Sequence, residues 1–291
     1  MHPMSADDFP DRRYLVTPAE LHERLGAVTL LDLRPAEDFA LGTIEGSRHM
    51  DIYGVSLNDS SEVPLKAFLA IFPTLFGARG IKLDKPVVIY DHESGERAAR
   101  AVWLLAVLGH PDVKILDGGT RAWIDSGRKL ERITHAQPPS DPAKTPPTPP
   151  PFKATPNHAL LATRFDVHAA IGDPGSVILD VRRESEYRGT EKRARRAGTI
   201  PGAVHVFWRE HLDAKGAFRP ADEIRKLYAS AGVTPDKTII PVCHGGYRSA
   251  NTFLALKSLG YPNVRNYVSS WGEWGNREDS KIVLLAEEGH A

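Results

Sequence analysis

Residues 30–34 (LLDLR) and residues 178–182 (ILDVR) are two copies of one motif, and this repetition decides the fold. Downstream of each copy, residues 42–46 (GTIEG) match residues 198–202 (GTIPG), and residues 108–111 (LGHP) match residues 259–262 (LGYP). The tryptophans at 123 and 274 also correspond. Because all these matches follow the same order in both halves, we infer that the chain is a doubled unit.

Short apolar runs alternate with segments that are apolar at helical spacing. The expected strands are residues 28–33, 87–90, 113–116, 177–181, 239–242 and 264–268, and the clearest expected helices are residues 98–109 and 249–260. Thr17, Pro18 and Glu20 form a helix-start signal, with Thr17 as the N-cap. This alternation predicts an α/β fold in which each half is a parallel sheet with helices on both faces.

A proline-rich tract separates the two halves. Residues 136–151 contain 8 of the 23 prolines, which excludes a helix or a central strand there. We therefore expect an N-terminal tail over residues 1–16, a first domain over 17–135, an extended linker over 136–160 and a second domain over 161–291.

Composition excludes several functional classes. Lys+Arg and Asp+Glu both number 37 in 291 residues, and this balance disfavours a nucleic-acid partner. No apolar run reaches the ~18 residues that a membrane span needs, and the first sixteen residues lack the apolar core of a signal peptide, so a cytoplasmic protein is expected. The intramolecular duplication is compatible with a monomer. The single cysteine, Cys243, rules out an intramolecular disulfide and a multi-cysteine metal site.

The candidate active site is the loop after the strand expected at residues 239–242. Cys243 ends that strand, Gly245 and Gly246 follow, and a helix is expected to start near Ser249, just after Arg248. Glycines allow backbone N–H groups to converge on an anion, and the helix N-terminus and the arginine add positive charge. Such surroundings typically lower a cysteine pKa, so the loop predicts a nucleophilic thiolate. The alternative is a small, buried and inert cysteine.

The doubled halves, the single cysteine and the loop Cys243-x-x-Gly246-x-Arg248 resemble the tandem-domain rhodanese family of sulfurtransferases. The resemblance implies two tandem rhodanese-like domains, of which only the second is catalytic. Asp91 stands in the first half where Cys243 stands in the second, and a carboxylate cannot carry a persulfide.

The resemblance implies a double displacement without metal or other cofactor. Cys243 takes a sulfur from an anionic donor such as thiosulfate and passes it to cyanide or a thiol. Arg248 and Cys243 are then the catalytic residues, and the binding loop for the persulfide comprises His244, Gly245, Gly246, Tyr247 and Ser249. A mercaptopyruvate sulfurtransferase and a persulfide carrier that serves a partner protein are alternatives. Phosphatases of related architecture place five residues between cysteine and arginine, whereas this loop places four.

The donor site is less well defined by the sequence. The resemblance implies a donor-binding arginine four residues after Arg182, where this chain has Glu186. Residues 182–196 contain seven basic and three acidic residues, and this basic segment could steer an anionic donor or lie in solvent. The candidate donor-binding residues are Arg182, Arg193, Arg195, Arg196 and Trp271. For Arg182 we also expect an ion pair with Asp180.

Overall fold

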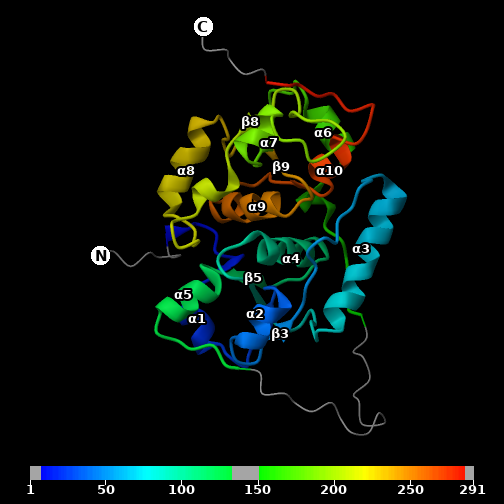
Figure 1. The fold of residues 1–291 in the computed structure, drawn as a ribbon. Coiled ribbons are helices and arrows are strands. Elements are labelled where there is room, and N and C mark those ends of the chain that lie inside the picture. The colour runs from blue at the N-terminus through cyan, green and yellow to red at the C-terminus, as the bar shows by residue number, and fades with distance from the viewer. Residues whose placement is uncertain (1–7, 133–150, 286–291) are drawn as a thin grey trace.

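The computed structural model describes residues 8–132 and 151–285. Of the linker predicted over residues 136–160, residues 136–150 fall outside the described residues; residues 151–157 contain no helix or strand, and residues 158–160 form a short 3-10 helix. Figure 1 shows two α/β halves that meet at a pair of helices in the middle of the molecule.

The first half contains a five-stranded sheet in the order β1-β5-β4-β2-β3, with every pair parallel. Its strands are β1 (Leu15–Val16), β2 (Thr29–Asp32), β3 (Arg48–His49), β4 (Val87–Tyr90) and β5 (Val113–Leu116). Its helices are α1 (Pro18–Glu23), α2 (Ala36–Leu41), α3 (Glu62–Gly77), α4 (Glu96–Val107) and α5 (Gly119–Asp125). Alternate side chains of β2 and β4 enter two separate apolar cores, so helices cover both faces.

The second half repeats this plan. Strands β8 (Val204–His205), β7 (Ser176–Asp180) and β9 (Thr238–Val242) lie in that order, and β10 (Asn266–Tyr267) pairs with β6 (Leu161–Ala162). A parallel bridge between Ile239 and Val264 links these two groups of strands. The helices are α6 (Arg164–Ala170), α7 (Glu184–Arg188), α8 (Ala221–Ser230), α9 (Arg248–Ser258) and α10 (Ser270–Trp274), with short 3-10 helices η3 (His158–Leu160) and η4 (Trp208–His211).

The predicted fold class is confirmed: two tandem α/β units with parallel strands and helices on both faces. The capping box at Thr17 and Glu20 is present as predicted, and α9 begins at Arg248, one residue before the expected start. Two details differ from the sequence prediction. Residues 15–16, assigned to the tail, form β1 because they complete the edge of the first sheet beside β5, and the predicted strand at residues 264–268 is reduced to β10.

Helices α4 and α9 hold the two halves together. They occupy equivalent places in the two units and pack against each other, as Figure 1 shows. Residues 98–107 of α4 are all buried, and every one of them except Arg100 is apolar, as expected of a helix that is packed on all sides. One continuous core crosses the interface, so the first half supports the back of the candidate site.

Candidate active site

Cys243 follows the last residue of β9 and lies behind the N-terminus of α9. The residue is only 1% exposed, and its Sγ accepts hydrogen bonds from the Gly246 N–H at 3.1 Å and the Ser249 hydroxyl at 3.4 Å. Gly246 has φ +81, a left-handed conformation that a side chain would strain. A Cβ at Gly246 would also collide with the Arg100 guanidinium and the Val268 carbonyl, so a glycine is required there.

The loop favours the thiolate of Cys243. Burial raises the pKa of this thiol, but the charge of Arg248 and hydrogen bonds from Ser249 and the Gly245 N–H outweigh it, and the pKa falls below its ordinary value. The positive end of the α9 dipole acts in the same direction. The geometry therefore supports the nucleophile that the sequence predicted.

Arg248 is held by Glu186 in a two-point ion pair. Its Nη1 and Nη2 lie 2.5 and 3.0 Å from the two carboxylate oxygens, and Arg193 approaches the same carboxylate at 3.6 Å. Burial opposes the charge on Glu186, but the Arg248 pairing lowers its pKa to about 2. Sequence reasoning singled out Glu186 as an unusual residue but missed this partner, because 62 residues separate the two side chains.

Of the other loop residues, His244 lies beside two arginines, whereas Tyr247 and Gly245 contact the first half of the chain. His244 is uncharged at neutral pH, because burial and the nearby Arg193 and Arg248 lower its pKa. Tyr247 donates from its hydroxyl to the Ile52 carbonyl at 2.6 Å, which ties the loop to the first half of the chain. Gly245 lies against Ser56, where a Cβ would be 3.1 Å from the hydroxyl. Thus first-half residues help to form the site.

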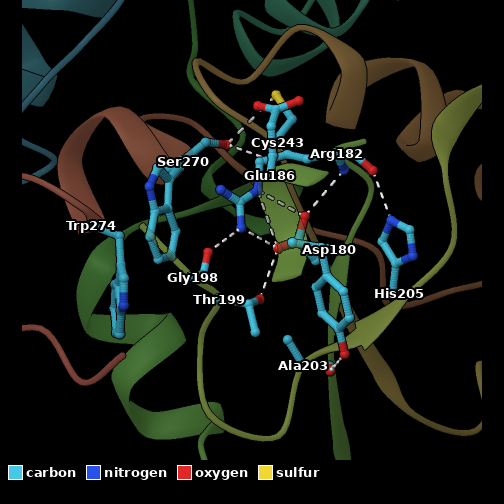
Figure 2. A network of polar contacts seen from close by, with 12 residues as sticks. Asp180, Arg182, Glu186, Gly198, Thr199, Ala203, His205, Cys243, Ser270 and Trp274 are labelled. Carbon is cyan, nitrogen blue, oxygen red and sulfur yellow. Dashed lines mark hydrogen bonds and ion pairs between the residues drawn. The ribbon is translucent and has the colours of Figure 1, made fainter. Parts of the chain in front are cut away.

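Ser270 is a site residue that the sequence reasoning did not assign. Its hydroxyl accepts from the Cys243 N–H at 3.1 Å (Figure 2). The same hydroxyl donates to the Tyr267 carbonyl at 2.8 Å. Ser270 has φ +50, the only non-glycine positive φ within the described residues. Backbone strain of this kind is maintained only when surrounding contacts require it. The signal in the sequence was its place at the start of residues 270–275, SWGEWG.

Arg182 lies in a buried polar network rather than on the surface of the site. Its guanidinium donates to both oxygens of Asp180 and to the Gly198 carbonyl, at 2.6 to 3.2 Å, and Thr199 donates to the same carboxylate (Figure 2). The first half repeats this network with Arg34, Asp32, Gly42 and Thr43. The repeated motifs that decide the fold are therefore structural, as the expected Asp180–Arg182 pair implied.

Of the five candidate donor-binding residues, Arg193 lines the cleft in front of Cys243. Trp271 is 1% exposed, packs against Arg182 and donates to the Arg196 carbonyl. The Arg196 guanidinium contacts the backbone carbonyls of residues 274, 277 and 280. Arg195 is exposed but does not line the cleft. Burial and occupied hydrogen bonds thus keep Arg182, Arg196 and Trp271 away from a donor in this conformation.

The cleft has a volume of about 800 Å³ and lies between the two halves. The charged groups that line it include Glu93, Glu96 and Arg97 from the first half and Arg193, Arg209 and Arg248 from the second. Most of these arginines are paired: Arg209 with Glu93, and Arg97 with Asp51. The cleft is therefore polar and mixed in charge, and it is far larger than a five-atom anion.

No group of three or more His, Cys, Asp or Glu side chains suited to a metal ion is found within residues 8–132 and 151–285. Among the helices of these two ranges, none is long and apolar enough to cross a membrane.

Comparison with known proteins identifies the family. The model of the rhodanese-like domain matches residues 17–126 and again residues 163–277. Two bacterial proteins named thiosulfate sulfurtransferase are each 35% identical: that of Pseudomonas aeruginosa over 278 residues, covering 95% of this chain and 99% of the relative, and that of Azotobacter vinelandii over 280 residues, covering 96% and 100%. The chain belongs to the rhodanese family. It is an enzyme of the sulfurtransferase class.

A further relative and a solved structure add detail. The sulfur carrier protein TtuD of Thermus thermophilus is 35% identical over 217 residues, which cover 70% of this chain and 73% of that protein. The structure of an anaerobic ergothioneine biosynthesis enzyme from Chlorobium limicola superposes with a TM-score of 0.77 at 19% identity, over 94% of this chain and 71% of that one. At this identity the structural likeness concerns the fold alone.

Proposed function

We propose that the protein transfers the outer sulfur of thiosulfate to cyanide or a thiol through a persulfide on Cys243. The observation that carries this proposal is the buried Cys243 Sγ, which accepts a backbone N–H and a hydroxyl hydrogen bond and has a lowered pKa. The two near full-length relatives named thiosulfate sulfurtransferase support thiosulfate as the donor.

The reaction has two displacements. The Cys243 thiolate attacks the outer sulfur of thiosulfate, the S–S bond of the donor breaks, and sulfite leaves with the bonding electron pair. Cyanide or a thiolate then attacks the terminal sulfur of the Cys243 persulfide, and the cysteine leaves as a thiolate. Charge is conserved in both steps, so no oxidant, metal or organic cofactor is required.

The loop suits the charge distribution of these steps. A persulfide anion at the α9 N-terminus meets the same positive field that lowers the thiol pKa. The four-residue spacing between Cys243 and Arg248 and the pairing of Arg248 with Glu186 favour sulfur transfer over phosphate hydrolysis, because the arginine is engaged away from a phosphate. We propose that the chain acts as a monomer in a reducing cytoplasm, where Cys243 stays a free thiol.

A persulfide carrier is the second candidate. The cleft of about 800 Å³ has room for the tail of a protein acceptor, and the Thermus thermophilus relative is named a sulfur carrier. In that case sulfur leaves Cys243 efficiently only in the presence of the partner protein.

Steady-state kinetics with thiosulfate and cyanide test the proposal. Thiocyanate should form with the wild type and not with Cys243→Ser, and replacing thiosulfate by 3-mercaptopyruvate should lower kcat/KM. A higher kcat/KM with 3-mercaptopyruvate than with thiosulfate would identify 3-mercaptopyruvate as the preferred sulfur donor. An active Cys243→Ser protein would refute the persulfide mechanism, and slow turnover of the wild type despite rapid loading would favour the carrier.

A further inference from the structure

Arg100 is a buried arginine of the first half that contacts the catalytic loop of the second. It lies on α4 and is 0% exposed. Its Nη1 donates to the Gly246 carbonyl at 3.2 Å, across 146 residues of sequence. Its Nε and Nη2 have no hydrogen-bond partner among the described residues. A buried guanidinium with two unpartnered nitrogens is costly, so its presence calls for an explanation.

The surroundings of Arg100 are aromatic rather than acidic. The guanidinium carbon lies 4.7 Å from the ring centroid of Trp103, 5.2 Å from that of Tyr247 and 5.8 Å from that of Phe68. No carboxylate pairs with it within residues 8–132 and 151–285. Burial lowers its pKa to about 10, so it remains charged at neutral pH. Ring faces offset part of the desolvation cost but leave a net positive charge.

Only one hydrogen-bonded residue, Gly246, separates this charge from the nucleophile. The Gly246 carbonyl accepts from Arg100 and from the Asn266 side chain at 3.1 Å, and the Gly246 N–H donates to the Cys243 Sγ. Two donors on this carbonyl help to hold Gly246 in its left-handed conformation, in which its N–H points at the sulfur.

The other cation beside Cys243 is compensated, whereas Arg100 is not. Arg248 on α9 is paired with Glu186 on α7, and Glu96 on α4 also acts on it. Burial raises the pKa of Tyr247 and lowers that of His244, so both are neutral. Arg193 also approaches Glu186. The thiolate of Cys243 is thus the group that the Arg100 charge can balance.

We propose that Arg100 is a positioning residue through which the non-catalytic half holds Gly246 and supplies a buried counter-charge to the sulfur anion of Cys243 and its persulfide. This inference rests on the proposed function for the persulfide, but its effect on the thiol can be measured without any sulfur donor. It also gives the first half a role beyond covering the cleft.

The pH dependence of Cys243 alkylation by iodoacetamide tests the proposal, because Cys243 is the only thiol in the chain. In Arg100→Met the midpoint should rise by about one pH unit, since a nearby opposite charge shifts a pKa by this order. Replacement of a buried charge by an apolar side chain of similar length is often neutral or stabilising, so the variant should melt no lower than the wild type. Arg100→Lys should return the midpoint toward the wild-type value.

Arg34→Met is the matched control. Arg34 is a buried arginine of the same half, but its partners are Asp32 and the Gly42 carbonyl, so its loss should lower stability and leave the alkylation midpoint unchanged. If Arg100→Met does not fold, Arg100→Gln, which keeps a donor but no charge, carries the same prediction. An unchanged midpoint in a folded, uncharged Arg100 variant would overturn the inference. A wild type that is alkylated normally but takes no sulfur from thiosulfate would refute the proposed function instead.

Discussion

The loops after β4 and β9 are two versions of one structure with different residues at the centre. In the second half, the Cys243 carbonyl accepts from the Trp271 N–H at 3.0 Å; in the first half, the Asp91 carbonyl accepts from the Thr120 N–H at the same distance. In the first loop the Asp91 carboxylate accepts the N–H groups of Glu93, Gly95 and Ala98, each at 3.1 Å. The first half therefore fills its own anion site with a carboxylate.

The comparison distinguishes the backbone anion site, which the fold forms in both halves, from the thiol, which the reaction requires and only the second half has. In both halves a parallel strand leads into a loop and a helix N-terminus with free backbone N–H groups. These N–H groups and the positive end of the helix dipole favour an anion. Only the second half places a thiol there, with one residue fewer before the arginine. The fold thus supplies the stabilising field twice, and the identity of one side chain decides whether it supports sulfur transfer.

The largest expected effect comes from copying the first loop into the second. Cys243→Asp should abolish thiocyanate formation from thiosulfate and cyanide, a loss of roughly 1,000-fold or more, because no other group can carry the sulfur. The reciprocal change in the first loop, Asp91→Ser, should alter kcat/KM less than twofold. A comparable loss in a folded Asp91→Ser protein would show that the first loop takes part in the reaction.

An intermediate effect on kcat/KM is expected when Arg248 of the second loop loses its ion-pair partner Glu186. Glu186→Gln removes the carboxylate that compensates Arg248, so kcat/KM for the thiosulfate dianion should rise several-fold at low salt and approach the wild-type value at high salt. Because a buried pair is broken, stability to urea should fall by about 3 kcal/mol.

The matched variant in the first half is Asp51→Asn, which releases Arg97, a cation that lines the same cleft but lies outside the Cys243 loop. It should raise kcat/KM less than Glu186→Gln does, because Asp51 is exposed to solvent and compensates Arg97 only weakly. An unchanged or lower kcat/KM in Glu186→Gln would mean that the ion pair orients Arg248 for the reaction rather than weakening its charge.

The smallest expected effect concerns stability alone. Burial raises the pKa of Asp91 to about 6, despite the opposing N–H donors of Ala98 and Glu93. A raised carboxyl pKa means that the folded state binds the proton more tightly, so this contribution is full below the ordinary pKa near 3.8 and is lost as pH rises through 6. Between pH 4.5 and 7.5 the wild type should lose about 2 kcal/mol that Asp91→Asn does not lose, measured by urea unfolding. Parallel stability profiles for the two proteins would contradict this account of Asp91.

The sequence correctly predicted those features of the site that depend on residues close together in the chain. The strand, the glycine turn and the helix around Cys243 form a continuous segment, and their arrangement follows from local backbone preferences and the parallel sheet. The pairing of Arg248 with Glu186 and the contact of Arg100 with Gly246 join distant segments, so a single sequence gives no signal for them. The motif containing Trp271 indicated a special position, but only packing shows that its side chain is buried beneath the site.

The central claim is that sulfur resides on Cys243 and not elsewhere in the chain. The most direct test is the intact mass of the wild type before and after excess thiosulfate, beside Cys243→Ser. The account predicts a gain of about 32 Da, one sulfur atom, on the wild type alone, with the added mass on the peptide that contains Cys243. No gain on a folded wild type with a free thiol, or the same gain on Cys243→Ser, would contradict it.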